Sequence, residues 1–165
     1  MQSKNNKHTA YLVLGSNLED REKNLETAIN FIEKNCGILS KKSPIFETLP
    51  WGKSDQPNFL NQALELQTDL SAKKLIKQLL HIEKLMGRIR IEKMGPRLID
   101  IDIVLMNEEV IQSELLILPH PFLHQRKFVL VPLAEIAPNA LHPIYNKTIA
   151  QLLKECEDVL DVKKF

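Results

Sequence analysis

Two aspartates separated by one residue are the feature of this sequence that most clearly suggests chemistry. Asp100 and Asp102 lie in the run Leu98–Val104, whose alternating side chains predict a strand with its isoleucines on the opposite face. Residues two apart in a strand are separated by roughly 6.6 Å at Cα, so the carboxylates repel each other unless a cation lies between them. Two divalent ions about 3.5–4 Å apart fit this span. Taken alone, the pair is more typical of a solvated strand face than of a site for two Mg²⁺ ions.

A basic segment immediately before the strand makes the Mg²⁺ site the favoured interpretation over a solvated strand face. Carboxylates that bind Mg²⁺ next to arginines that bind phosphate oxygens are the composition that a polyphosphate site requires. Together the two features favour a metal-assisted site for a polyphosphate ligand. The basic residues, interrupted by the single acid Glu92, are Lys84, Arg88, Arg90, Lys93 and Arg97.

The composition of the 165-residue chain limits the classes of protein to consider. It is ordinary for a globular protein, and the length predicts a single domain over residues 1–165, with 1–8 as a flexible N-terminal extension. A net charge of +1 argues against nucleic acid as a partner and favours a small anionic ligand. No apolar run approaches the length of about eighteen residues that spans a membrane. Cys36 and Cys156 form no Cys-x-x-Cys pair, which predicts a reduced, cytoplasmic protein.

Hydrophobic periodicity predicts helices and strands that alternate along the chain. One helix should run from Leu18 to a stop at Gly37, and a second should begin after Ser71 and end at Gly87. Pro44 should confine the strand around it to a sheet edge or a strand end. The predicted fold class is α+β, a ferredoxin-like βαββαβ core with C-terminal additions and helices packed on a mainly antiparallel sheet. The other predicted elements are strands at Ala10–Leu14 and Phe59–Thr68, a short helix at Val129–Ala137 interrupted by Pro132, and a terminal helix at Thr148–Cys156.

Two further patterns leave alternatives open. His120 and His124 have a spacing that can hold zinc on a helix, but Pro121 between them disfavours continuous helical geometry. Trp51 is the only tryptophan and lies in the polar loop Leu49–Pro57. A lid that covers a ligand would explain its position, and simple packing on the domain explains it about as well.

Five motifs make the chain resemble the 6-hydroxymethyl-7,8-dihydropterin pyrophosphokinases of folate biosynthesis along nearly its whole length. They occur in order and at compatible spacing, and the segment from Lys93 to Val104 alone fits the signature pattern of that family. The motifs are Gly15-Ser16-Asn17, Asp55-Gln56-Pro57 with Asn61, Gly87-Arg88-Ile89-Arg90, Gly95-Pro96-Arg97-x-x-Asp100-x-Asp102, and Pro119-His120 followed by Arg126-x-Phe128.

The resemblance implies transfer of the β,γ-pyrophosphoryl group of ATP to the hydroxymethyl oxygen of the pterin, with release of AMP. It also implies a cytoplasmic monomer whose partners are these two small molecules, with no nucleic acid and no membrane. Asp100 and Asp102 resemble the ligands of two Mg²⁺ ions. The implied ATP contacts are Glu83, Arg88, Arg90, Arg97, His120 and Arg126, and the residues implied in catalysis are Arg88, Arg97, Asp100 and Asp102. The implied pterin pocket consists of Thr48, Trp51, Phe59, Asn61 and Phe128, with the two phenylalanine rings on opposite faces of the heterocycle.

Phosphoryl-type transfer depends on positioning and charge neutralisation, so the reaction needs no nucleophile–base pair. Met94 stands where many members carry tryptophan, and Leu115–Leu118 lacks the basic and hydroxyl residues found in some members. These differences leave open how the site closes and how the nucleotide is held. One alternative is a metal-dependent phosphohydrolase that uses Asp100, Asp102 and His120. The other is a ferredoxin-like RNA-binding module. The low aromatic content of 5% and the net charge of +1 disfavour this alternative.

Overall fold

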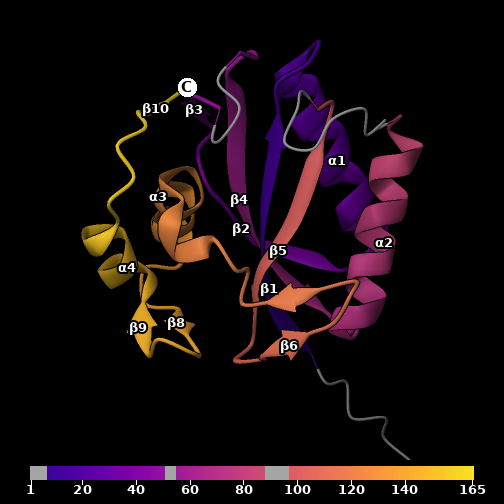
Figure 1. The fold of residues 1–165 in the computed structure, drawn as a ribbon. Helices are drawn as coiled ribbons and strands as arrows, with labels where there is room; N and C mark the ends of the chain where they lie inside the picture. The colour runs from indigo at the N-terminus through magenta and orange to yellow at the C-terminus, as the bar shows by residue number, and fades with distance from the viewer. Residues whose placement is uncertain (1–6, 51–54, 88–96) are drawn as a thin grey trace, which may run out of the picture.

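The computed structural model describes residues 7–50, 55–87 and 97–165. Trp51, Arg88 and Arg90 lie outside the described residues, as do residues 51–54 of the loop that could form a lid. Figure 1 shows a central sheet that runs through the molecule, with a pair of helices on either face.

The central sheet is antiparallel at every described strand pair and places the aspartate strand beside β1. Its strands are ordered β10-β3-β4-β1-β5, and β2 also pairs with β4. The element order β1-α1-β2/β3-β4-α2-β5 follows the predicted βαββαβ pattern, so the predicted fold class is confirmed. The bounds are β1 His8–Ser16, β2 Ile38–Lys42, β3 Phe46–Thr48, β4 Phe59–Thr68, β5 Asp100–Met106 and β10 Val162–Lys164.

Pro44 divides the second predicted strand into two short strands, as a residue without a backbone N–H is expected to do. The two halves pair with different ends of β4, since Ile38 lies opposite Gln67 and Phe46 lies opposite Asn61. The sequence did not predict β10, which pairs with the outer edge of β3. A three-residue strand with two exposed side chains carries too little periodicity to be recognised.

Helices α1 and α2 cover one face of the sheet, and α3 and α4 lie on the other (Figure 1). Side chains of β1 alternate between two hydrophobic cores: Leu12 and Leu14 pack with α1 and α2, whereas Val13 packs with α3 and α4. Among the described residues, no helix is both long enough and apolar enough to span a bilayer. The helices are α1 Arg21–Asn35, α2 Ala72–Leu85, α3 Lys127–Ile136 and α4 Ile149–Glu155, with a 3-10 turn η1 at Leu123–Gln125. Two small hairpins complete the fold, β6 Ile111–Gln112 with β7 Ile117–Leu118, and β8 Leu141–His142 with β9 Lys147–Thr148.

Local signals set the helix ends, and the structure corrects one predicted helix start and one predicted interruption. The Asp20 side chain accepts a backbone N–H of the first turn at 3.1 Å, so α1 begins after Asp20 and not at Leu18. Ser71 caps α2 as predicted, and Gly87 follows that helix with φ +86°, which favours glycine. Pro132 lies inside α3 and does not interrupt it. Proline removes one backbone donor, and the helix persists because its neighbours are buried against the sheet.

Candidate active site

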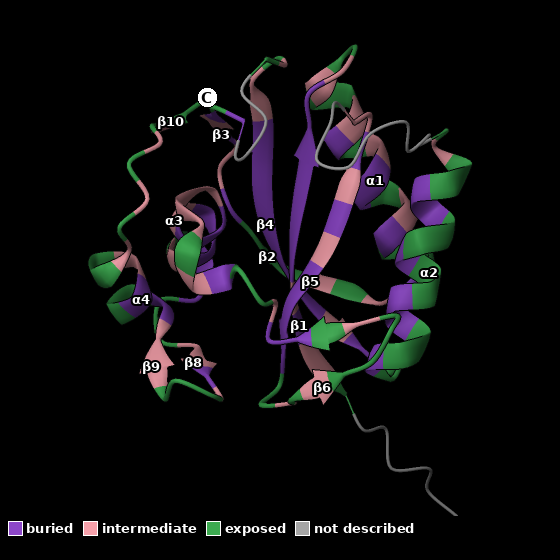
Figure 2. Cartoon of the chain, in the orientation of Figure 1, coloured by how far each residue is buried: buried purple, intermediate pink, exposed green. Residues whose placement is uncertain are grey.

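Strand β5 places the two aspartates as its alternation predicted. Figure 2 shows intermediate and buried positions alternating along the first part of this strand. Ile101 and Ile103 are 3% and 2% exposed and pack in the core beneath α1 and α2. Asp100 and Asp102 point to the other side of the strand and are partly exposed. Nη1 of Arg97 donates to Oδ2 of Asp100 at 2.8 Å. The predicted arginine and the carboxylates therefore form one polar cluster.

Negative charge is concentrated around Asp102. Burial, followed by the charges of Asp100 and Glu83, raises the pKa of Asp102 well above its ordinary value, and Arg126 and Arg97 oppose this rise. A hard divalent cation would relieve the remaining repulsion. Mg²⁺ binds well to one or two carboxylates when substrate phosphates supply other ligands. The two aspartates therefore fit this ion by their chemistry and their placement.

Glu83 of α2, which the family resemblance implied as an ATP contact, is buried. It is 3% exposed, and its Oε2 accepts the backbone N–H of Ile101 at 3.0 Å. This bond joins α2 to β5 at the residue between the two aspartates. Glu83 thus fixes the strand that carries Asp100 and Asp102 and also contributes negative charge beside them.

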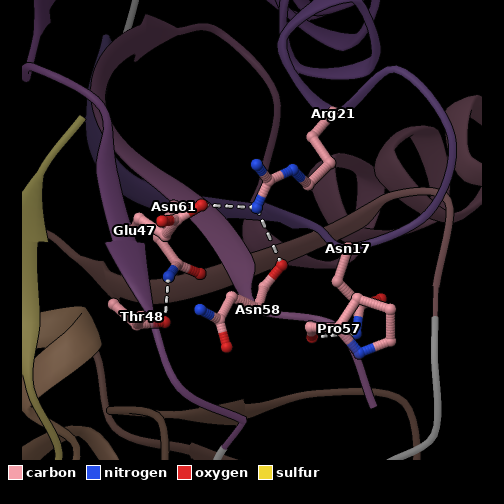
Figure 3. Close-up of polar contacts among 7 residues, drawn as sticks. All are labelled: Asn17, Arg21, Glu47, Thr48, Pro57, Asn58 and Asn61. Carbon is pink, nitrogen blue, oxygen red and sulfur yellow. Dashed lines mark hydrogen bonds and ion pairs between the residues drawn. The ribbon is translucent and has the colours of Figure 1, made fainter.

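A pocket with aromatic walls, called the aromatic pocket below, is lined by Phe59, Phe128 and the polar pair Thr48 and Asn61. Nδ2 of Asn61 donates to Oγ1 of Thr48 at 2.7 Å, which fixes the orientation of the amide (Figure 3). Its Oδ1 would lie 3.1 Å from a Cβ at Gly15, so glycine allows the amide to approach β1. The described lining also includes Val13, Leu49, Arg97, Asp100, Asp102 and Arg126.

A second pocket lies along β5, α2 and the β6–β7 hairpin, and it is called the hairpin pocket below. Asp100 and Asp102 line it too, so the two pockets meet at the carboxylates. Glu83 and His120 contribute polar groups to its wall. Apolar side chains make up most of the rest: Ile76, Leu80, Leu115, Leu116 and Ile117, with Ser113 and Glu114 beside them.

His120 presents a neutral imidazole to the hairpin pocket. Burial, and then the charge of Arg126, lowers the pKa of His120 to about 4. Its Nδ1 accepts the backbone N–H of Phe122 at 3.2 Å, so the proton of the neutral ring lies on Nε2. That N–H is a suitable donor for a phosphate oxygen. His124 lies instead against Tyr145, with ring centroids 4.8 Å apart.

Asn17 connects three segments of the site, a role that the sequence reasoning missed although it singled out the motif Gly15-Ser16-Asn17. Its Oδ1 accepts the backbone N–H of Arg97 at 2.7 Å. Its Nδ2 donates to the carbonyl oxygen of Pro57 at 3.0 Å (Figure 3), and also to Oε1 of Gln56 at 3.0 Å. Asn17 is only 2% exposed, and the three bonds are partly buried. Asn17 thereby fixes the backbone of Arg97 relative to the loop before β4.

We expect Asn17→Ala to lower the free energy of unfolding by roughly 1–3 kcal/mol, because it leaves partly buried backbone groups of Pro57 and Arg97 without these partners. Urea unfolding followed by circular dichroism measures the loss. Asn35→Ala is the matched control, since Asn35 is exposed and donates to the carbonyl of Phe31 at 2.8 Å at the end of α1. Equal losses in the two variants would contradict the role of Asn17.

The structure brings most of the predicted site residues together. Glu83 and His120 line the hairpin pocket, while Arg88, Arg90 and Trp51 belong to the segments outside the described residues. The predicted residues that line the aromatic pocket are Thr48, Phe59, Asn61, Arg97, Asp100, Asp102, Arg126 and Phe128.

The fold and the site define a class of protein. An antiparallel α+β sandwich carries two pockets that meet at paired carboxylates with two arginines beside them, an arrangement suited to transferring a charged group between two ligands. Residues 11–138 match the family model of the 7,8-dihydro-6-hydroxymethylpterin-pyrophosphokinases. The chain belongs to this family.

Relatives named 2-amino-4-hydroxy-6-hydroxymethyldihydropteridine pyrophosphokinase align over most of the chain. The Aquifex aeolicus protein is 44% identical over 147 residues, which cover 89% of this chain and 91% of the relative. The Bacillus subtilis protein is 45% identical over 128 residues, 77% of each chain. Among solved structures, a Plasmodium falciparum HPPK-DHPS chain superposes with a TM-score of 0.77 at 18% identity. That match covers 90% of this chain and 44% of the longer Plasmodium chain, and it shows the fold.

Proposed function

We propose that this chain performs the reaction of its family with the residues described above. The chain transfers the pyrophosphoryl group of ATP to the hydroxymethyl group of 6-hydroxymethyl-7,8-dihydropterin, a step of folate biosynthesis. The observation that supports the residue assignment is that the aromatic pocket and the hairpin pocket share Asp100 and Asp102. A pterin in one pocket and a nucleotide in the other would bring their reacting atoms together at these carboxylates.

On the donor side, the triphosphate of ATP would extend from the hairpin pocket to the carboxylates. Arg97 and Arg126 are charged donors for its oxygens, and Nε2–H of His120 is a neutral one. Arg88 and Arg90, outside the described residues, remain proposed phosphate contacts. We assign Glu83 to this side of the site through its bond to β5, which sets where the two aspartates stand.

Asp100 and Asp102 would hold two Mg²⁺ ions, which when bound neutralise the charge on the phosphate oxygens. Two protein carboxylates suffice for this role when phosphate oxygens and water complete the coordination. Before the ions bind, Arg97 and Arg126 partly offset the repulsion between the carboxylates, as the direction of their effect on the pKa of Asp102 indicates.

On the acceptor side, Phe59 and Phe128 would stack on the two faces of the pterin ring. The hydroxyl of Thr48 accepts a bond from Asn61 and retains its own proton to donate to the ring. Trp51, outside the described residues, remains a proposed contact. In the transfer, the hydroxymethyl oxygen forms a bond to the β-phosphorus as the bond from that phosphorus to the α-phosphate oxygen breaks. The hydroxyl proton is released, and the pterin diphosphate and AMP result.

Product analysis tests the proposed function directly. We expect the protein, mixed with Mg²⁺, ATP and 6-hydroxymethyl-7,8-dihydropterin, to give AMP and pterin diphosphate in equal amounts by anion-exchange chromatography. ADP or free phosphate would indicate a different phosphotransferase or a phosphohydrolase. The absence of any turnover would favour a binding module. A reaction without pterin is the control, and it should release no AMP.

We also propose that residues 1–165 act as a single domain, as a cytoplasmic monomer whose ligands are ATP and the pterin. One sheet carries both helical layers, and both pockets are lined by residues of this one chain. Gel filtration with light scattering tests the oligomeric state, and a mass of twice 19.0 kDa would contradict the monomer.

A further inference from the structure

Arg21, the first residue of α1, connects segments that border the aromatic pocket. Its Nη1 donates to Oε2 of Glu47 at 2.7 Å and to the carbonyl oxygen of Asn58 at 3.1 Å (Figure 3). Its Cζ also lies 5.9 Å from the ring centroid of Phe165, just after β10. One guanidinium group therefore contacts β3, the residue before β4, and the segment that follows β10.

Two of these contacts are each one residue away from a residue of the pocket. Glu47 precedes Thr48 in β3, and Asn58 precedes Phe59 at the start of β4. Thr48 and Phe59 lie opposite each other as the last pair of the β3–β4 ladder. Successive side chains of a strand point to opposite faces, so Glu47 can meet Arg21 while Thr48 faces the pocket.

Strand β10 pairs with β3 from the outside along its whole length. Val162 lies opposite Thr48, and the backbone N–H of Phe165 donates to the carbonyl oxygen of Ile45 at 2.9 Å. The contact between Arg21 and the Phe165 ring links this outer strand to α1. Strand β3 is thus held by the start of α1, through Glu47, and by a strand that comes from far along the chain.

We propose that Arg21 is a positioning residue for the pterin: it fixes the spacing between Thr48 and Phe59. This inference rests on the proposed function of the aromatic pocket. The ion pair with Glu47 is partly exposed, with side-chain exposures of 28% and 36%, and such pairs add little to global stability. Its effect should instead be on the geometry of the pocket. A shift of about 1 Å in a positioning contact is enough to impair substrate use.

The test compares steady-state kinetics of the wild type with Arg21→Met, which keeps the apolar stem and removes the hydrogen bonds. We expect the KM for the pterin to rise roughly 5- to 20-fold, while kcat and the KM for MgATP stay within about twofold. Arg21→Lys keeps the charge for Glu47 but offers no guanidinium fork. Its KM for the pterin should therefore lie between the values of the wild type and of Arg21→Met. Pterin titration in the presence of a non-hydrolysable ATP analogue should show the same order of affinities.

Lys147→Met is the matched control, because Lys147 forms an ion pair of equal length, 2.7 Å, with Glu155 on the β9–α4 segment. It should leave both KM values unchanged. A pterin KM that stays at the wild-type value in Arg21→Met, or a parallel rise for both substrates, would overturn the positioning role. Failure of the wild type to make AMP and pterin diphosphate would instead overturn the proposed function, so the two outcomes are distinguishable.

Discussion

Alanine at position 100 or 102 should lower kcat/KM by at least about 10³-fold while the protein remains folded, because metal-assisted stabilisation of phosphoryl charge amounts to several kcal/mol. Both carboxylates lie on the face of β5 that lines the pockets, and the core face of the strand consists of isoleucines. The variants therefore remove ligands without opening a cavity. The measurement is turnover at saturating Mg²⁺, with circular dichroism as the check on folding. Near-normal turnover in either variant would refute the two-metal assignment.

Removing one of these carboxylates should lower activity but raise the stability of the metal-free protein. In metal-free buffer we expect Asp102→Asn to unfold at a higher urea concentration than the wild type, since burial and the charges of Asp100 and Glu83 disfavour an ionised Asp102. A carboxylate whose pKa is raised by folding stabilises the protein below its unfolded pKa, about 3.9, and loses that contribution as pH rises through the folded pKa. The advantage of Asp102→Asn should therefore grow as pH rises above about 4.

His120 gives the wild type a pH slope of the opposite sign. Its pKa is lowered to about 4, so its contribution to stability is lost as pH falls from about 6.5 towards that value. The wild type and Asp102→Asn both carry His120, so the difference between their free energies of unfolding reports mainly on Asp102. Asp69→Asn, on an exposed turn, controls for the loss of a surface charge. A difference between wild type and Asp102→Asn that shrinks as pH rises would show that Asp102 is not held in a repulsive environment.

The second large effect concerns the rings of the aromatic pocket. Phe59→Ala and Phe128→Ala should each weaken pterin binding by about 1–3 kcal/mol, in line with the stacking of bases on aromatic side chains. Binding of a non-hydrolysable MgATP analogue should change little, because the adenosine is assigned to the hairpin pocket. Pterin titration by fluorescence or calorimetry, with the analogue present, measures the effect.

Phe122→Ala is the control for these two variants. Arg126 lies over both rings, with its Cζ 4.9 Å from the centroid of Phe122 and 5.5 Å from that of Phe128. Losing either ring removes a contact of Arg126, but only Phe128 lines the aromatic pocket. Pterin affinity should therefore fall in Phe128→Ala and hold in Phe122→Ala. If pterin affinity falls equally in both variants, the Phe128 ring acts through Arg126 and does not stack on the pterin.

The sequence by itself determined those features that depend on short-range spacing. A two-residue period is enough to put Asp100 and Asp102 on one face of β5 and the isoleucines on the other. A residue with no backbone N–H breaks the strand at Pro44, and a hydroxyl caps α2 at Ser71. Because such signals act within a few residues, the α+β class and the element order could be predicted from them.

The tertiary structure alone decided which distant residues hold the site together. The family resemblance implied Glu83 only as an ATP contact, yet its side chain binds the backbone of Ile101, 18 residues away. Asn17 reaches the backbone of Arg97 across 80 residues. Strand β10 carries no readable pattern, and its place beside β3 depends on an edge that only the folded sheet provides. A hydrogen bond between remote residues leaves no periodicity in the chain, since it fixes one pair of atoms and not a repeating face. The meeting of two pockets at one pair of carboxylates could for that reason be seen only in the folded protein.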